Sequence, residues 1–356
     1  MITGIYSCND GGFYYVRTTG DADGQRLFWF GEFPGGFSNV HVGVLRAIPG
    51  RTGAFSIDDG AWYDVPKGIA TSAGTLDLTL EANVIQKLQG TGGFSGSRWT
   101  KINGRPACGA RTNLKGFTGE GLTGVWVGND GGIYYVRQKG AEIVWFGEGC
   151  ANPGVVPAFA NVFQGSISGS NFGGQWADVP YGNNIGSGTI NLRAVNPNRI
   201  ERVTQTGGFG GSVWERSSTI GNRVVTDLQV TITTGGDDLR PGAVAYGIVD
   251  LKRRGPLPKV TLNRGAWGGN STNTVSISLS RAGEVPIRLR DLASLILEQD
   301  GAPRNIFETY NNWNVDFIKV VANTPQGPVC LANGCGQPLV RLTGEQTSFK
   351  LAISLP

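Results

Sequence analysis

Length, composition and charge limit the kinds of protein that this chain can be. Its 356 residues are enough for two or three domains, and its 57 glycines follow no Gly-X-Y period, which excludes a collagen-like fibre. A formal net charge of +4, spread along the chain, does not indicate nucleic-acid binding, and no apolar run is long enough for a membrane span. Frequent glycine together with nine tryptophans favours short strands joined by tight turns.

The first two parts of the chain are copies of one unit. The matching pairs of segments are NDGGFYYVR with NDGGIYYVR, FWFGE with VWFGE, WYDVPKG with WADVPYG, and TGGFSGSRW with TGGFGGSVW. Their offset drifts only slightly, so gains and losses fall in loops. The repeat predicts one domain over residues 1–101, a Gly-rich linker over 102–121 and a second domain over 122–218.

Eight strand signals follow one another within the second copy. They are VWVG, GIYYVRQ, EIVWFG, NVFQGSIS, GGQWADVP, GTINLRAV, RIERVTQ and GSVWERS, separated by turns rich in Asn, Asp and Gly. Parallel pairing needs long crossover connections, and the chain has no room for them. Consecutive antiparallel strands in this number typically close into a barrel, which removes exposed edges. We therefore expect each copy to form an eight-stranded up-and-down barrel.

Residues at the two ends of the second copy resemble the closure signature of the lipocalin and avidin superfamily. The copy opens with LTGVW, which ends at Trp126, and closes with VWER, which ends at Arg216. In that superfamily the Trp plugs one end of the barrel and the Arg lies across its ring as a cation–π contact. The first copy has Tyr6 and Lys101 at the matching positions. The resemblance implies that these pairs close the barrels. It does not imply biotin, because no set of biotin-contacting residues matches.

The repeat ends before residue 224, and the last part of the chain has its own pattern. Apolar and polar residues alternate in DLQVTITT and TNTVSISLS, and about seven strands over 224–356 favour a β-sandwich. The stretches TITTGGDDLR, SLILEQDGAPRN and NNWNVDFIKVVA, in that order, resemble a PLAT-type domain. The resemblance implies docking on a membrane or a protein partner, and calcium held by acidic loop residues, here Asp237, Asp238 and Asp300. We expect the basic run at 252–254 to be a solvated loop.

Residues suited to catalysis are few. The only histidine, His41, has Phe163 at the matching position of the second copy, which favours a packing role. Ser–His–Asp and Cys–His pairs are therefore unavailable outside the first barrel, and no phosphate-binding or zinc-protease motif occurs. Carboxylates leave an alternative open, because four of them recur between the copies: Asp64 with Asp178, and Glu32 with Glu148. Either they cap turns and end strands, or two of them share a cleft as in a glycan hydrolase.

Aromatic, arginine and aspartate side chains are the candidates for ligand binding. The tryptophans either fill the barrels or line an open mouth that stacks on a flat ligand such as a sugar. The arginines either point into the barrels, where they meet a carboxylate, or lie along the outer surface. The tentative ligand-binding set is Arg17, Trp29, Trp62 and Asp64 in the first copy and Arg137, Trp145, Trp176 and Asp178 in the second.

Cysteine usage and the start of the chain leave the cellular compartment open. Five cysteines are an odd number, and Cys330 and Cys335 enclose a short loop as a candidate disulfide pair. The chain starts without a recognisable signal sequence, so either a signal was removed or none was made.

Together, these features predict an all-β protein with two tandem eight-stranded antiparallel up-and-down barrels plus a C-terminal β-sandwich. The expected function is non-enzymatic recognition of a glycan, a lipid surface or a small ligand, with two linked barrels raising avidity. We expect a glycan, membrane surface or protein as partner, no nucleic acid, no transmembrane segment and no cofactor other than calcium. The alternatives are a carboxylate-dependent glycan hydrolase and a purely structural or interaction module, of which a toxin component is one form.

Overall fold

The computed structural model describes residues 2–21, 24–33, 36–105, 117, 119–153, 156–280, 285–303 and 306–356. The chain divides into two compact units. The first runs to Arg216 and contains both copies of the repeat, and the second contains Ser217–Pro356 together with the segment that begins at Cys150. Within the described residues, we find no helix whose length and apolar character would let it span a membrane.

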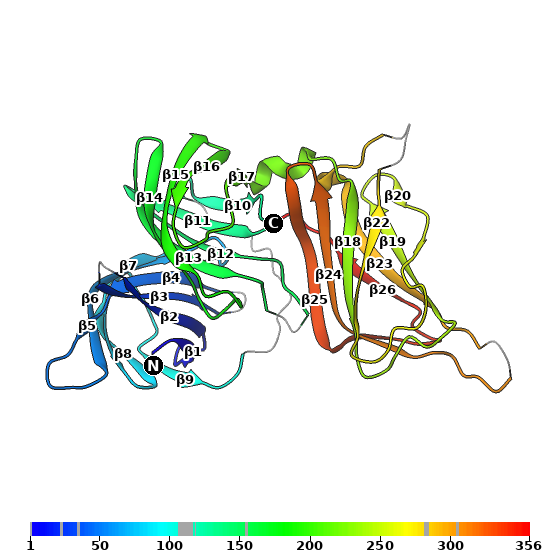
Figure 1. Ribbon diagram of the computed structural model, residues 1–356, viewed down its shortest axis with the longest axis horizontal. Coiled ribbons are helices and arrows are strands. Elements are labelled where there is room, and N and C mark those ends of the chain that lie inside the picture. Colours follow the sequence, from blue (N-terminus) through cyan, green and yellow to red (C-terminus); the bar gives the residue numbers. More distant parts are fainter. Residues whose placement is uncertain are drawn as a thin grey trace. The chain divides into compact units, whose positions relative to one another are not determined.

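The first copy folds into a closed barrel of eight antiparallel strands. In chain order these are β1 (Gly4–Cys8), β2 (Phe13–Asp21), β3 (Gly24–Glu32), β4 (Ser38–Val44), β6 (Ala54–Asp64), β7 (Ala73–Glu81), β8 (Val84–Gly90) and β9 (Arg98–Ile102). Pairing of β1 with β9 and of β4 with β6 closes the cylinder, and the short strand β5 (Arg46–Ala47) adds to β6. Figure 1 draws this barrel in blue to cyan.

The second copy closes in the same way. Its strands are β10 (Gly124–Gly128), β11 (Ile133–Lys139), β12 (Glu142–Glu148), β13 (Ala160–Ser168), β14 (Asn171–Asp178), β15 (Ser187–Asn196), β16 (Arg199–Gln205) and β17 (Val213–Arg216). Each strand pairs with the next, and β10 pairs with β17 to complete the cylinder. The predicted all-β class with two eight-stranded antiparallel barrels is confirmed.

The repeated NDGG motif forms the tight turn between the first two strands of each barrel. Gly11 has a φ of 85°, a left-handed conformation that glycine adopts without strain. The Asp10 carboxylate accepts a hydrogen bond from the Gly12 amide at 2.8 Å and another from the Tyr14 hydroxyl at 2.6 Å. Asn9 accepts from the Ser97 amide at 2.9 Å, and the second copy repeats these bonds. The motif therefore fixes the turn, orients a core tyrosine and ties the turn to the last hairpin loop.

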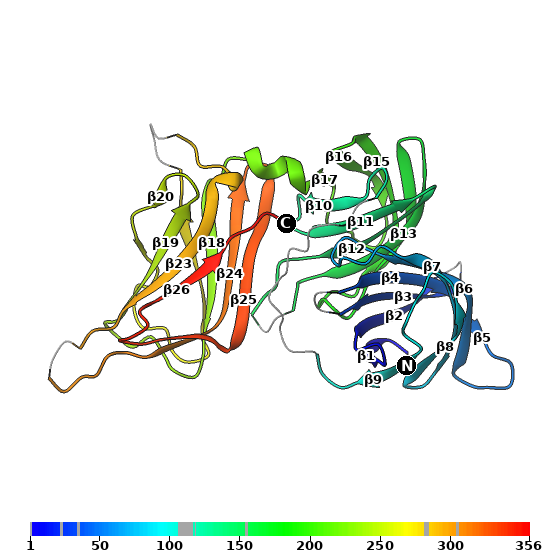
Figure 2. The ribbon, with the colours of Figure 1, turned by 180° about the vertical axis from the view of Figure 1, so that it is seen from behind.

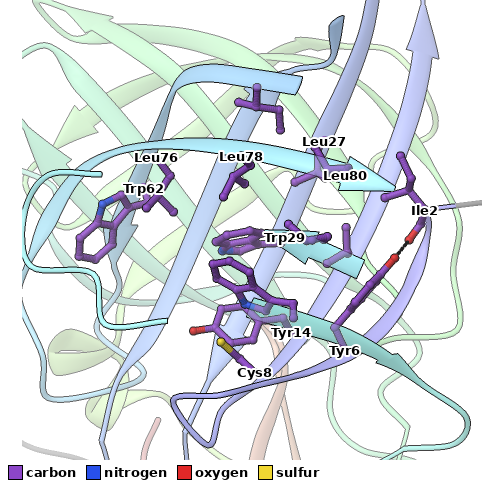
Figure 3. Close-up of a cluster of buried hydrophobic side chains, with 14 of the residues drawn as sticks. Ile2, Tyr6, Cys8, Tyr14, Leu27, Trp29, Trp62, Leu76, Leu78 and Leu80 are labelled. Carbon is purple, nitrogen blue, oxygen red and sulfur yellow. Dashed lines mark hydrogen bonds between the residues drawn. The ribbon is translucent and has the colours of Figure 1, made fainter. Parts of the chain in front are cut away.

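Strand alternation sends one set of large side chains into each barrel. In the first barrel Trp29, Trp99 and Tyr14 are fully buried and meet edge to face or tilted, with ring centroids 5.2–5.6 Å apart. Figure 3 labels Trp29 and Tyr14 within this cluster. The second barrel repeats this arrangement with Tyr134, Trp145 and Trp214. An eight-stranded barrel is just wide enough for side chains to fill, so these rings form the core.

The residues that the superfamily resemblance pairs at the barrel ends are neighbours in the structure. In the second barrel the Arg216 guanidinium lies 4.6 Å from the Trp126 ring centroid and donates to the Thr123 and Gly121 carbonyls. In the first barrel Tyr6 and Lys101 are register partners, and Lys101 donates to the Thr3 carbonyl at 2.7 Å. Tyr6 and Trp126 each donate to the carbonyl of the residue four positions earlier; Figure 3 marks this bond for Tyr6 and Ile2.

The second unit consists of two antiparallel sheets (Figure 2). One sheet has the order β22 (Thr272–Ser278), β18 (Asp227–Thr234), β24 (Trp313–Thr324), β25 (Gly327–Leu342). The other has the order β20 (Gly255–Pro256), β19 (Val244–Leu251), β23 (Leu292–Asp300), β26 (Ser348–Ala352), and β21 (Val260–Thr261) also pairs with β19. Two short 3-10 helices, η1 (Ser217–Asn222) and η2 (Leu289–Asp291), precede strands of this unit.

A disulfide in the second unit differs from the pair that the sequence suggested. Cys330 is bonded to Cys150, with a Cα–Cα distance of 5.6 Å, and not to Cys335. Both Cys330 and Cys335 lie on the continuous strand β25. Five residues of extended chain span roughly 16 Å, beyond the reach of a disulfide. The expected short loop is part of a strand, and this geometry excludes the expected bridge.

Candidate functional site

The outer faces of the two barrels pack against each other inside the first unit, through strands β2, β3 and β4 of one and β12, β13 and β14 of the other. At the centre, the Phe30 and Phe146 rings stack with centroids 3.6 Å apart and an interplanar angle of 9°. These residues occupy equivalent positions in the repeat. Tyr181 meets both rings edge to face at 5.5 Å. We call this surface the inter-barrel interface.

A single lysine, partly buried, lies beside the stacked rings. The Lys67 ammonium is 3.1 Å from Glu148 Oε2, 3.3 Å from Glu32 Oε2 and 3.1 Å from the Tyr181 hydroxyl. It also lies over three rings, 4.9 Å from the Phe30 and Phe146 centroids and 4.4 Å from that of Tyr181. Burial opposes its charge, but the two glutamates outweigh burial and raise its pKa well above the usual value. Lys67 therefore stays charged and links carboxylates from both barrels.

The repeated arginines bind across the interface in a reciprocal way. Arg17 of the first barrel donates to the Asp178 and Gly186 carbonyls of the second, at 3.1 and 3.0 Å. Arg137 of the second barrel donates to the Asp64 and Ser72 carbonyls of the first, at 2.9 and 2.7 Å. Of the two positions that the sequence left open, both arginines take the outer one. Arg17 thus binds the β14–β15 connection of the second barrel, and Arg137 binds the β6–β7 connection of the first.

The repeated aspartates are buried turn caps behind those arginines. Asp64 Oδ2 accepts from the Ser72 amide and Asp178 Oδ2 from the Gly186 amide, both at 2.7 Å. Burial raises the pKa of each carboxyl to about 6, against the lowering effect of the amide bond and the arginine. The structure thus brings four residues of the tentative ligand-binding set to one interface, namely Arg17, Asp64, Arg137 and Asp178.

The four tryptophans of the candidate ligand-binding set lie elsewhere, in the barrel interiors. Trp29 donates to the Asn39 side chain at 3.1 Å, and Trp62 donates to the Thr91 carbonyl at 3.1 Å. Phe94, from the TGGF loop, packs edge to face on Trp62 at 4.8 Å. The second copy repeats these contacts at the same kinds of distance: Trp145 with Asn161, Trp176 with Thr206, and Phe209 on Trp176. Aromatic rings thus fill the interior up to the loop end of each barrel.

The remaining candidates for catalysis are the two repeated glutamates and the single histidine. Glu32 and Glu148 contact the same nitrogen of Lys67, so their oxygens are closer together than the roughly 10 Å that a two-carboxylate hydrolase allows. His41 is fully buried and packs on Trp29 with ring centroids 4.4 Å apart. Burial lowers its pKa to about 3.

The acidic residues proposed for calcium are not gathered into one cluster. The Asp237 carboxylate pairs with Arg341 at 2.8 Å, and Asp300 accepts from the Ala302 amide at 3.4 Å. The Asp238 backbone carbonyl accepts from the Asn311 side chain at 3.3 Å. Within the described ranges, no group of three or more His, Cys, Asp or Glu side chains is placed to hold a metal ion.

Residues at the centre of the interface are absent from the sequence-based set. Phe30, Phe146, Lys67 and Tyr181 were all missed. One signal was available: the strands read FWF and VWF, with adjacent large apolar residues that must point to opposite faces. A strand that is apolar on both faces is covered on both. Lys67 and Tyr181 gave no such signal, because they differ at the matching position of the repeat.

Comparisons with known proteins add no family. No protein-family model and no curated protein matches the chain. Among solved structures, the Helicobacter pylori beta clamp in complex with carprofen aligns at 7% identity, covering 97% of this chain and 92% of that one, with a TM-score of 0.12. The DNA polymerase sliding clamp of Bacillus subtilis aligns at 8% identity over 100% and 91% of the two chains, with a TM-score of 0.11. Scores this low carry no argument about fold or function.

Proposed function

We propose that this chain is a non-enzymatic interaction protein in which the two barrels act as one solid scaffold and partners bind to outer surfaces. The observation that carries the proposal is the filled interior of both barrels. The buried cluster of each interior includes at least three tryptophans and one tyrosine, and Phe94 or Phe209 packs against it at the loop end. A barrel packed in this way leaves its exterior as the surface for recognition.

The inter-barrel interface supports the same proposal. Arg17 and Arg137 are the side chains best suited to bind a polar ligand, but they donate hydrogen bonds to carbonyl groups of the other barrel. The interface fixes the two repeats as one body, so they present their outer surfaces at a constant spacing. A glycan, a lipid surface and a protein remain the partner classes, and we favour a protein. Kinship with avidin-type barrels and PLAT-type sandwiches is part of the proposal, supported by the contact of Arg216 with Trp126 and by the two antiparallel sheets of the second unit.

The hydrolase alternative is supported by one observation, the closeness of Glu32 and Glu148. Two carboxylates act in such an enzyme when one is the acid and the other the base or nucleophile. Here both contact one ammonium, and three rings cover that ammonium. This arrangement favours a structural ion cluster over a catalytic pair.

A dye-binding experiment tests the solid scaffold. We expect the full chain to show no saturable binding of anilinonaphthalene sulfonate, whereas Phe94→Ala with Phe209→Ala opens both interiors and gains it. The exposed residue Leu88 supplies a matched control, Leu88→Ala, which should leave dye binding unchanged. Saturable binding to the unaltered chain would contradict the proposal.

A second assay tests the absence of catalysis. The full chain and its Glu32→Gln and Glu148→Gln variants are incubated with a panel of polysaccharides, and released reducing ends are measured. We expect no release from any of them. Release that either substitution abolishes, while near-ultraviolet circular dichroism shows the variant to be folded, would establish the hydrolase instead.

A further inference from the structure

Strand β22 lies at the edge of its sheet and lacks the features that usually stop an edge strand from pairing with another chain. Among the described residues, β22 pairs only with β18, so alternate amides and carbonyls along its other side have no strand partner. Its sequence, TNTVSIS, contains no proline and no charge. Proline, lysine and short length are the usual devices that stop an edge strand from pairing with another chain.

The other edges of the described sheets carry such devices. β25 contains Pro328 and Pro338, and the disulfide from Cys150 reaches it. β26 has five residues, including a lysine, and β20 and β21 have two residues each. The contrast singles out β22 as the edge that is open to strand addition.

A small cavity with a mixed lining lies beside this edge, between the two sheets. Its volume is about 20 Å³, and its lining comes from β19, β21, β22 and the connections next to them. The apolar part of the lining is Val249, Leu257, Val260, Ile277, Leu279 and Ile287. Its size suits the end of one aliphatic side chain from a strand that pairs with β22.

The chain next to the cavity is strongly basic. Lys252, Arg253, Arg254 and Lys259 are all exposed, and they flank the cavity residue Leu257 on both sides. Lys259 pairs with Glu298, whereas no described carboxylate pairs with Lys252 or Arg253. An occupant of this edge therefore meets a positive field, which favours acidic side chains.

We propose that β22 and the basic run at 252–254 form a docking site for an extended, acidic segment of a partner protein. The segment adds an antiparallel or parallel strand to the β22 edge, sets an aliphatic side chain in the cavity and places its carboxylates toward the basic run. This inference rests on the proposed interaction function and names the partner class. If it fails, the dye experiment still decides whether the barrels are solid.

The test uses the full chain and the fluorescein-labelled heptapeptide EVEVEVE, whose length matches that of β22. We expect saturable binding by fluorescence anisotropy that weakens as salt rises, and slower exchange of β22 amide hydrogens in the presence of the peptide. A peptide with proline in place of the central valine should bind about tenfold more weakly, because it loses a ladder donor.

Two variants with matched controls localise the site. The methyl group of Gly247→Ala would lie 2.9 Å from Ile277 Cδ1 and 3.0 Å from Leu262 Cδ2, so it forces the Ile277 side chain, which lines the cavity, to move. Gly268→Ala is the control, because nothing lies within 4 Å of its new methyl group. Charge reversal of Lys252, Arg253 and Arg254 to Glu is matched by Lys139→Glu on the exposed β11–β12 turn. Each test variant should weaken binding about tenfold or more, and neither control should change it.

Four results would overturn the inference. One is no saturable binding of EVEVEVE at low salt, and another is binding that Gly247→Ala and the charge reversal both leave unchanged in folded protein. The third is β22-dependent formation of a dimer, seen by sedimentation, which would assign the edge to a second copy of the chain. Tight binding of single-stranded DNA that excludes the peptide would assign the basic run to nucleic acid instead.

Discussion

The Phe30 and Phe146 rings stack on each other with centroids 3.6 Å apart, although 116 positions separate them in a chain whose repeat makes them equivalents. Equivalent residues meet in this way when two copies of a fold are related by an approximate two-fold axis. The reciprocal bonds of Arg17 and Arg137 obey the same relation. Lys67 and Tyr181 break it, because the repeat places a cation on one side and a phenol on the other. The duplication has thus produced an internal dimer with one charged centre.

Removal of that centre should strongly destabilise the first unit. Lys67→Met leaves the Glu32 and Glu148 carboxylates, which are largely shielded from water, without their shared ammonium. Loss of one partner from a fully buried ion pair costs about 3–5 kcal/mol, and we expect a loss of about 2–3 kcal/mol for this partly exposed cluster. Urea unfolding followed by tryptophan fluorescence measures the loss. Lys139→Met, at an exposed turn, is the control and should change stability by less than about 0.5 kcal/mol. Equal stability of the two variants would show that the cluster contributes nothing.

His41 should make the protein sensitive to acid. Its folded pKa of about 3 lies below the usual value of 6.5, so the unfolded chain binds the proton more readily. The associated stability is present above pH 6.5 and is lost as the pH falls toward 3, by about 3 kcal/mol at pH 4. His41→Phe copies the second barrel, where Phe163 stacks on Trp145 at 4.0 Å. This variant should lose less stability between pH 7 and pH 4 than the natural chain does, in urea unfolding at both values.

Asp64 and Asp178 should have the opposite effect. Their folded pKa of about 6 lies above the usual 3.8, so the folded state binds protons more readily, and stability falls as the pH rises from about 4 to 6. Asp178→Asn retains an acceptor for the Gly186 amide and removes the titration. We expect the variant to gain about 3 kcal/mol relative to the natural chain at pH 7 and less than about 1 kcal/mol at pH 4. A constant difference across this range would mean that the carboxyl does not titrate as described.

The disulfide between Cys150 and Cys330 can be tested by peptide mapping. Digestion without reduction should yield a linked peptide pair that contains Cys150 and Cys330, identified by mass spectrometry. Cys150→Ser should destabilise the second unit by about 2–5 kcal/mol, which is typical for loss of a native disulfide. Recovery of a Cys330–Cys335 link instead would contradict the strand assignment of β25.

Strand number and barrel closure could be predicted from the sequence because both depend on local signals. The NDGG turns need glycine at positive φ, and each strand alternates a core residue with an outward one, so eight hairpin-linked strands had few other arrangements. The repeat strengthened this prediction, since two copies gave the same pattern at each turn.

The sequence alone determined that each copy curls into a cylinder filled by its own tryptophans, since strand period and turn chemistry act over a few residues. Only the tertiary structure decided what the outward residues do. Whether Arg17 faces solvent or the Asp178 carbonyl depends on how the outer surfaces of the two barrels pack against each other. No local sequence pattern predicts that packing. The same holds for Cys330, whose partner lies 180 residues away in the chain and beside it in space. Packing between distant segments therefore set the interface, the ion cluster and the disulfide.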